Sequence, residues 1–239
     1  MEQLSTVTTW LHHLATCPST NTWALEHLAT LKEGDVIFTE EQTAGRGQHG
    51  RTWQSPKGVL TASFILESVL LSGFSLAVGL AVIFAVEDLM PDLAGKLQLK
   101  WPNDLYISER KLGGILCEGK GQKLVIGIGL NCRSELPVAE AISLHQLTNF
   151  VPENLELLEK LRQTLLEAAS LIRVQGLTPL LPELRRRDLL ANRQITITYN
   201  QETLFGQGAG IDAQGRLMIA LADGQVRSFM TGNVQWRGL

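Results

Sequence analysis

The chain has 239 residues, of which 44% are hydrophobic and 19% are charged, an ordinary composition for a globular protein. A net charge of −3 argues against a nucleic-acid-binding surface, and no apolar run is long enough to cross a membrane. Cys17, Cys117 and Cys132 are widely spaced, which argues against a disulfide framework or a zinc site and favours a cytoplasmic protein.

The long N-terminal part of the chain predicts a mixture of helices and strands. The polar residues Ser19–Asn21 precede an apolar pattern that stops at Gly34, which predicts a helix with a polar N-cap and a glycine stop. Apolar spacing predicts a buried helix over residues 76–90 and a long amphipathic helix over residues 155–172. Strands are expected at residues 35–39, 59–66, 96–100, 105–108, 114–118 and 124–130. These elements predict an α+β fold in which helices pack on one sheet.

The pattern changes near Arg193, where short strand candidates replace the longer elements. They are expected at residues 195–199, 203–205, 209–211, 217–221 and 226–229. We therefore predict a larger domain over residues 1–190 and a small β-barrel over residues 191–239. The run Arg185–Arg187 just before the barrel is expected to form a solvated helix face rather than a nucleic-acid patch.

The segment Gly45–Trp53 lies in a loop, predicted over residues 43–58, that can bind an anion. Its glycines let the backbone approach a ligand, and consecutive N–H groups in such a loop form an anion-binding concavity. Arg46 and Arg51 can pair with phosphate or carboxylate through two hydrogen bonds. A flexible hairpin is the alternative, and the GxGxxG spacing alone is weak because no long helix follows. Trp53 could stack on an adenine or belong to the core.

The second informative segment is Lys100–Tyr106, followed by Lys111–Leu116. Asn103 could read a base edge or orient a loop, and Asp104 could help to hold Mg²⁺, which takes few protein carboxylates. Lys111 stands beside glycines and could neutralise a carboxylate, although a capped turn and a surface lysine are the plainer alternatives. Together the two segments predict a site that activates a carboxylate with a nucleoside triphosphate.

In order and spacing, these motifs resemble those of the biotin protein ligases. The resemblance runs through Ser19–Asn21, Gln42, Gly45–Trp53, Lys100–Tyr106, Lys111–Leu116, Gly127–Asn131, Gly208–Asp212 and Gly215–Leu217, and so covers nearly the whole chain. It implies a fold like that of class II synthetases and biotin–lipoate ligases. In that fold, helices flank a central mixed β-sheet, and a small SH3-like β-barrel follows at the C-terminus.

The resemblance also implies a reaction in two steps. Biotin and MgATP would give biotinyl-5′-AMP and pyrophosphate. The adenylate would then acylate a lysine of the biotin carboxyl carrier domain of acetyl-CoA carboxylase or a related enzyme, with release of AMP. ATP, Mg²⁺ and biotin are the small molecules that this reaction needs, and the carrier protein is its macromolecular partner. Neither DNA nor a membrane is expected as a partner.

By position, the resemblance implies that Lys111 and Arg46 are catalytic and that Asp104 binds the metal. The biotin-binding residues that it implies are Ser19, Thr20, Asn21, Gln42, Arg46, Gly47, Gln48, Lys111, Gly114 and Leu116. The residues implied for ATP or the adenylate are Gly45, Gly47, Gly50, Arg51, Trp53, Asn103, Asp104 and Asn131, with Gly129 at the border of the pocket.

Gln48 departs from the family pattern, because many relatives have arginine at this loop position. Too few residues precede Ser19 for the helix-turn-helix domain that some relatives carry, so the monofunctional form is expected. A homodimer is compatible with the resemblance. Two alternatives remain at this point: a lipoate or octanoate protein ligase, and a non-catalytic regulator that binds biotin or a nucleotide.

Overall fold

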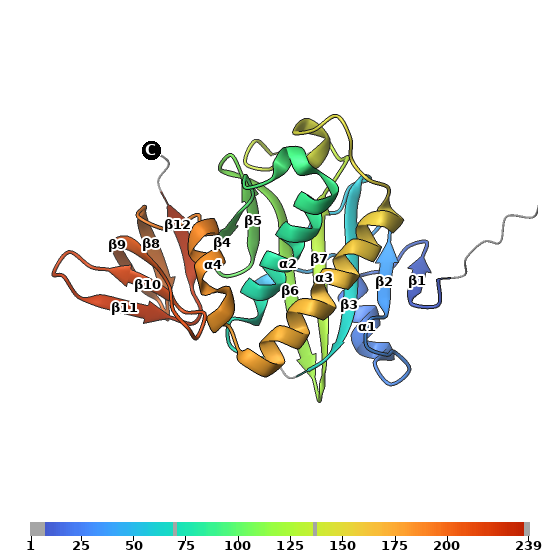
Figure 1. Cartoon of the computed structure of the whole chain (residues 1–239), viewed down its shortest axis with the longest axis horizontal. Coiled ribbons are helices and arrows are strands. Elements are labelled where there is room, and N and C mark those ends of the chain that lie inside the picture. The colour runs from blue at the N-terminus through green and yellow to red at the C-terminus, as the bar shows by residue number, and fades with distance from the viewer. Residues whose placement is uncertain (1–7, 69–70, 136–137, 237–239) are drawn as a thin grey trace, which may run out of the picture.

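The computed structural model describes residues 8–68, 71–135 and 138–236. A central sheet carries two helices across one face, and a smaller sheet lies beside it at the C-terminal end (Figure 1). The predicted α+β class with a central mixed sheet is confirmed. Within the described part of the chain, no helix combines the length and the apolar character needed to span a membrane.

The central sheet has seven strands in the order β1-β2-β3-β7-β6-β5-β4. Their bounds are β1 Leu11–Leu14, β2 Val36–Thr39, β3 Val59–Glu67, β4 Gln98–Lys100, β5 Asp104–Ile107, β6 Arg110–Lys120 and β7 Lys123–Asn131. β1 and β2 pair in parallel, and the other neighbours are antiparallel. The three long strands β3, β7 and β6 form the middle of the sheet and carry most of the candidate site.

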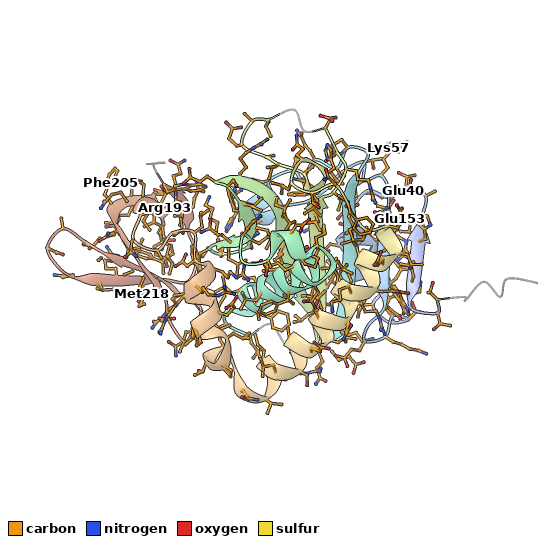
Figure 2. The ribbon with its side chains drawn as sticks, turned by 45° about the horizontal axis from the view of Figure 1, so that its top comes forward. Glu40, Lys57, Glu153, Arg193, Phe205 and Met218 are labelled. Carbon is orange, nitrogen blue, oxygen red and sulfur yellow. The ribbon has the colours of Figure 1, made fainter. Side chains whose placement is uncertain are left out.

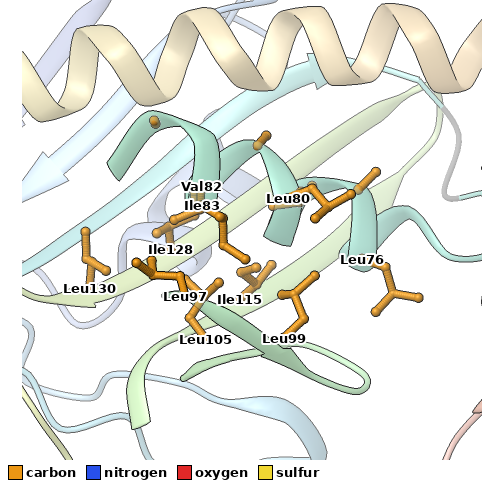
Figure 3. Packing of buried hydrophobic residues seen from close by; sticks show 14 of the residues in the cluster. Leu76, Leu80, Val82, Ile83, Leu97, Leu99, Leu105, Ile115, Ile128 and Leu130 are labelled. Atoms are coloured by element: carbon orange, nitrogen blue, oxygen red, sulfur yellow. The ribbon is translucent and has the colours of Figure 1, made fainter. Parts of the chain in front are cut away.

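The helices α2 (Phe74–Leu89) and α3 (Asn154–Gln175) cover one face of the central sheet. α2 is apolar nearly all round because it lies between the sheet on one side and α3 on the other. Leu80 and Ile83 of α2 belong to the same buried cluster as Ile115 and Ile128 of the sheet (Figure 3). This core fixes the strands whose opposite face holds the site.

The opposite face is partly covered by α1 (Thr20–His27). Ser19 caps this helix, and its Oγ accepts the backbone N–H of Thr22 at 3.5 Å. Ile65 and Val125 face α1, whereas their strand neighbours Phe64 and Ile126 belong to the α2 side. Since side chains alternate along a strand, the two clusters lie on opposite faces. The predicted helix is therefore right in position, but it ends at His27 rather than at Gly34.

The second sheet follows α4 (Leu181–Arg187) and has five antiparallel strands. The strands are β8 Gln194–Tyr199, β9 Glu202–Ile211, β10 Leu217–Ala220, β11 Val226–Phe229 and β12 Asn233–Trp236, in the order β11-β10-β9-β8-β12. Their buried side chains continue the core of the central sheet. Figure 2 shows Phe205 and Met218 on this sheet and Arg193 close to the central part, where it pairs with Glu109. The domain boundary near residue 190 stays a prediction.

Several predicted elements need correction. The strands expected at residues 203–205 and 209–211 are one strand, β9. β1 and β12 are strands that the sequence patterns did not predict. The solvated face expected for Arg185–Arg187 is wrong for Arg187, which is 2% exposed and pairs with Glu87 and Glu183. The described part of the chain also contains four short 3-10 turns: Gln48–Gly50, Pro91–Leu93, Leu144–Gln146 and Thr178–Leu180.

Candidate active site

The floor of the candidate site is a run of small side chains across three neighbouring strands. Thr61 on β3 pairs with Gly129 on β7, and Gly129 pairs with Gly114 on β6. One step along the sheet, Gly127 pairs with Leu116. All five residues line one cavity on the sheet face opposite α2. The register of β3, β7 and β6 therefore creates the floor, because it brings residues far apart in sequence to paired positions.

Two floor glycines make room for side chains from other segments. A Cβ at position 129 would overlap the indole ring of Trp53. A Cβ at position 127 would overlap Oδ1 of Asn21. Trp53 from the loop and Asn21 from α1 can thus lie directly on β7 only because these two positions lack side chains.

A polar cluster at the start of α1 forms one end of the cavity. Gln42 Oε1 accepts the backbone N–H of Thr20 at 2.9 Å and its hydroxyl at 3.3 Å. The hydroxyl of Ser63 donates to Asn21 Oδ1 at 2.6 Å and lies 2.8 Å from Thr20 Oγ1. Asn21 Nδ2 in turn donates to the carbonyl of Leu116 at 3.2 Å. These bonds fix hydroxyl and amide groups at the cavity wall before any ligand arrives.

The glycine-rich loop folds back on itself over the cavity. Trp53 N donates to Gly45 O at 2.9 Å, and Gly47 N donates to Arg51 O at 2.7 Å. His49 and Gly50 take positive φ angles of 55° and 73°, which reverse the chain at the tip. A hairpin and a loop that binds a ligand, which the sequence left open as alternatives, are therefore compatible. The loop is a tight hairpin that also lines the cavity.

The two loop arginines have different surroundings. Arg46 donates to Glu118 of β6 through both terminal guanidinium nitrogens, at 2.8 and 3.2 Å, and to the hydroxyl of Thr22 at 3.3 Å. Arg51 is exposed and lines the cavity from the other side of the hairpin. Arg46 is thus tied to the sheet, whereas Arg51 faces the open side of the site.

An ion pair between neighbouring strands forms the opposite end of the cavity. Lys111 Nζ donates to Asp104 Oδ1 at 2.7 Å and lies 5.6 Å from the centroid of the Trp53 ring. The side-chain amide of Asn103 donates to the carbonyl of Ile115 at 2.7 Å, which fixes the turn before β5. A cation, a carboxylate and an aromatic face therefore meet over the glycine floor. Lys111 is not a free surface lysine.

Of the residues that the structure describes, Asp104 carries the one carboxylate that lines this cavity. Among the described residues, no group of three or more His, Cys, Asp or Glu side chains could hold a metal. This donor set fits Mg²⁺, which binds through one or two protein carboxylates and takes its other ligands from phosphate and water. It does not fit a metal that needs an all-protein cage.

Most residues named from the sequence lie at the cavity. Those that line it are Ser19, Thr20, Asn21, Gln42, Arg46, Gly47, Gln48, Arg51, Trp53, Asn103, Asp104, Lys111, Gly114, Leu116 and Gly129. Three do not line it. Gly45 closes the base of the hairpin, Gly50 lies at its exposed tip, and the buried amide of Asn131 donates to the carbonyls of Lys111 and Ile142.

Sequence reasoning missed several residues of the wall. The structure adds Thr52, Thr61, Ala62, Ile115, Gly127 and Ile128 to the lining. It also adds Ser63 and Glu118, which bind lining residues. Alternation of side chains shows which residues of β3 share a face with Thr61 and which residues of β7 share a face with Gly127. Only the strand register shows that these two sets of residues lie side by side on the same face of the sheet.

Cys117 follows Leu116 on β6 but faces away from the cavity. Its side chain packs against the core on the α2 side of β6, and burial raises the pKa of the thiol to about 12. All three cysteines are free. A thiolate nucleophile is therefore not part of this site.

Fold and site together define a ligase of the biotin and lipoate type. The model of the Biotin/lipoate A/B protein ligase family matches residues 14–133, and that of the Biotin protein ligase C terminal domain matches residues 191–237. Within that class, the chain belongs to the biotin protein ligases, and it is an enzyme.

Individual relatives agree with this assignment. The chain is 35% identical over 235 residues to the bifunctional ligase/repressor BirA of Escherichia coli, covering 92% of this chain and 71% of that protein. It is 32% identical over 197 residues to the biotin–[acetyl-CoA-carboxylase] ligase of Mycobacterium tuberculosis, covering 78% and 73%. The solved biotin protein ligase of Aquifex aeolicus in complex with biotin and ATP superimposes with a TM-score of 0.84 at 27% identity, covering 96% and 99%.

Proposed function

We propose that this enzyme activates biotin with MgATP to biotinyl-5′-AMP and then transfers biotin to a lysine of a biotin carboxyl carrier domain. The acceptor belongs to acetyl-CoA carboxylase or a related carboxylase. One observation carries the proposal: the Lys111–Asp104 pair faces Trp53 across a glycine floor, next to a prearranged cluster of hydroxyl and amide groups. The relatives with a ligase name support it.

The polar cluster at α1 suits the ureido ring of biotin. That ring has two N–H donors and one carbonyl acceptor, and Ser19, Thr20, Asn21 and Gln42 offer both kinds of partner. Beyond this cluster, the cavity is lined by the apolar side chain of Leu116 and by the bare backbone of Gly127 and Gly129. This lining suits the thioether and the aliphatic chain. The biotin carboxylate then points toward Lys111.

The other end of the cavity suits the nucleotide. Trp53 offers an aromatic face for adenine, and Arg51 offers a guanidinium for phosphate. Asp104 would hold Mg²⁺ with one carboxylate oxygen, and the metal would neutralise phosphate charge. Asn103 lies in the adjacent wall, within reach of the base or ribose. Gly47, Gln48 and Gly114 would border the phosphate and the activated acyl group.

Chemistry proceeds by two displacements. An oxygen of the biotin carboxylate attacks the α-phosphorus of ATP, and pyrophosphate leaves with the electron pair of the broken P–O bond. The ammonium group of Lys111 neutralises the carboxylate and then the charge that develops on the α-phosphate. In the second step, the neutral amine of the acceptor lysine attacks the acyl carbon. AMP leaves with the pair of the C–O bond, and the amine proton passes to solvent.

Three finer parts of the proposal follow from the family resemblance. The natural acceptor is the carrier protein of acetyl-CoA carboxylase, the chain works in the cytoplasm, and it can form a homodimer. Partner preference is tested by offering isolated carrier domains of different carboxylases and comparing rates of lysine biotinylation. Analytical ultracentrifugation with and without biotin and ATP tests the dimer.

The decisive experiment measures pyrophosphate release from ATP with biotin or lipoate as the acid. We expect release with biotin and little with lipoate, because a dithiolane lacks the N–H and carbonyl groups that the α1 cluster matches. Faster release with lipoate would assign a lipoate ligase instead. Biotin binding without pyrophosphate release would assign a non-catalytic regulator.

Lys111 is the cation nearest to the proposed reacting carboxylate. Lys111→Ala should lower biotin-dependent pyrophosphate release by a factor on the order of 10²–10³, the usual cost of one preorganised charge contact. The matched control is Lys120→Ala, which removes an exposed lysine at the end of the same strand. Near-normal release by Lys111→Ala would contradict the assignment of Lys111.

A further inference from the structure

Glu118 connects three parts of the candidate site. It lies on β6 two residues beyond Leu116, so strand alternation puts its side chain on the cavity face. Its Oε1 accepts Arg46 Nη2 at 2.8 Å, and its Oε2 accepts Arg46 Nη1 at 3.2 Å and Asn21 Nδ2 at 2.9 Å. One carboxylate therefore joins the sheet to the loop and to α1.

The α1 side of this connection is fixed. Asn21 is buried, and its amide is held by Ser63 and by the carbonyl of Leu116 as well as by Glu118. The carboxylate cannot follow the loop outward without giving up its bond to Asn21. Glu118 is consequently a fixed anchor on the sheet.

On the loop side, Arg46 sits near the base of the hairpin, between Gly45, which accepts from Trp53, and Gly47, which donates to Arg51. These bonds join the two arms of the hairpin, so a displacement of Arg46 would carry both arms with it. Holding Arg46 against the sheet therefore holds Gln48 and Trp53 over the cavity.

We propose that Glu118 is a positioning residue whose ion pair with Arg46 holds the loop of residues 43–58 closed over the cavity. This ion pair, called the latch below, thereby sets how long the adenylate stays bound. The proposal rests on the proposed function, since it takes biotinyl-5′-AMP as the retained ligand. A bidentate bond between arginine and carboxylate is strong and directional, so it suits a latch. The side chain of Gln48 in the loop is neutral. The negative charge that holds the loop is that of Glu118 on the sheet.

The test variant is Glu118→Gln. Glutamine keeps the size of the side chain and an oxygen for Asn21, but it removes the negative charge that faces Arg46. Enzyme loaded with labelled biotinyl-adenylate is chased with excess biotin, and the dissociation of the label is timed. We expect release roughly three- to tenfold faster in Glu118→Gln, with a retained burst of pyrophosphate in the first turnover.

Two further measurements separate a latch from a general structural role. Raising the salt concentration should speed adenylate release in the unmodified enzyme and change it little in Glu118→Gln, because salt screens a partly exposed ion pair. Arg46→Gln should also speed release, and the double variant should be no faster than the faster single one. Additive effects of the two substitutions would overturn the latch.

The control is Glu202→Gln, which removes the ion pair with Arg227 in the C-terminal sheet. We expect normal release from this variant. Release from Glu118→Gln at the unmodified rate, with normal pyrophosphate production, would overturn the latch and leave the proposed function standing. Absence of pyrophosphate from the unmodified enzyme with biotin would instead overturn the proposed function, and the latch would fall with it.

Discussion

At the scale of single residues, the absence of a side chain at position 129 matters as much as the indole of Trp53. The ring lies on the backbone of β7, and a methyl group at position 129 would occupy its place. We expect Gly129→Ala to push Trp53 off the strand and to weaken ATP binding by about 1–3 kcal/mol, the usual value of a base–aromatic stack. Biotin binding, at the other end of the cavity, should change less. Calorimetric titration with each ligand measures both.

The Trp53→Ala variant, used as a second background, separates the loss of stacking on the indole from a direct steric effect of the methyl group at position 129. Trp53→Ala should weaken ATP binding by a similar amount. In that background Gly129→Ala should cost little more, because its methyl group no longer meets the indole. Strictly additive losses, or a large fall in melting temperature for Trp53→Ala alone, would favour the alternative that Trp53 is a core residue.

Gln48 lines the cavity from the loop, at a position where the family resemblance leads us to expect arginine. A charged donor bonds phosphate about twice as strongly as a neutral amide. Gln48→Arg should therefore slow release of biotinyl-adenylate in the absence of acceptor and change biotin affinity little. Stopped-flow measurement of release from both proteins checks this. Equal rates would mean that the side chain at this position does not influence retention.

The sequence could predict the chemistry-bearing side chains but not all of their partners. Lys111 and Asp104 were expected at one site, and they form an ion pair there. Asn131 was expected at the pocket, yet its amide holds the backbone of Lys111. A local pattern identifies residue types, whereas the partner of a buried amide depends on contacts with segments far along the chain.

At the scale of elements, strongly periodic segments were predicted well. α2 and α3 lie where their apolar spacing placed them. The two strands expected at residues 203–205 and 209–211 are one strand, β9, which runs through Gly206 and Gly208. In the structure, both lie inside the strand, and a Cβ at either position would overlap a neighbouring backbone carbonyl, of Ala220 and Leu190 respectively. A glycine demanded by close packing cannot be distinguished from a turn glycine by sequence alone.

The end of α4 carries a buried carboxylate with an unusual titration. Asp188 accepts the backbone N–H of Leu190 through Oδ1 at 2.9 Å, while its Oδ2 is buried with no partner among the described residues. Burial raises the pKa of this carboxyl to about 6, and the bond from Leu190 opposes the rise. Between about pH 4 and pH 6, the carboxyl of Asp188 therefore holds a proton in the folded state that it has already lost in the unfolded state.

The contribution of Asp188 to stability should consequently fall as the pH rises through this window. At this carboxyl the folded state binds more protons than the unfolded state, so its contribution to the free energy of unfolding decreases up to about pH 6 and then levels off. Asp188→Asn keeps the acceptor for Leu190 and removes the charge. We expect it to be more stable than the unmodified protein at pH 7, by about 1–3 kcal/mol, and equal to it near pH 4.

Urea unfolding at pH 4.5 and at pH 7 measures this difference. Asp223→Asn is the matched control, because Asp223 also accepts a backbone N–H, from Gln225, but is exposed. It should shift neither curve. A loss of stability in Asp188→Asn at pH 7 would show that the charged form of Asp188 is favourable in the fold.

At the scale of the whole molecule, the two sheets share one core and meet at the motif that carries Asn103 and Asp104. Trp101 is buried, and its Nε1 donates to Gly215 O at 3.0 Å. Lys100 Nζ lies 4.7 Å from the Trp236 ring centroid, and Tyr106 meets the same ring edge-on at 5.4 Å. Burial lowers the pKa of Lys100, and the nearby Asp104 opposes this effect. The C-terminal sheet thus packs against the Asp104 end of the site, where we propose that the nucleotide binds.

This arrangement predicts that the C-terminal sheet influences ATP more than biotin. Trp236→Ala removes the ring that covers Lys100 and Tyr106, so the segment before Asp104 loses its support. A cation–π contact of this kind contributes about 0.5–2 kcal/mol, and we expect KM for ATP to rise roughly two- to thirtyfold with KM for biotin nearly unchanged. Trp236→Phe keeps an aromatic face and should recover most of the loss. Equal changes in both KM values, or no recovery by phenylalanine, would mean that Trp236 acts on overall stability and not through Lys100.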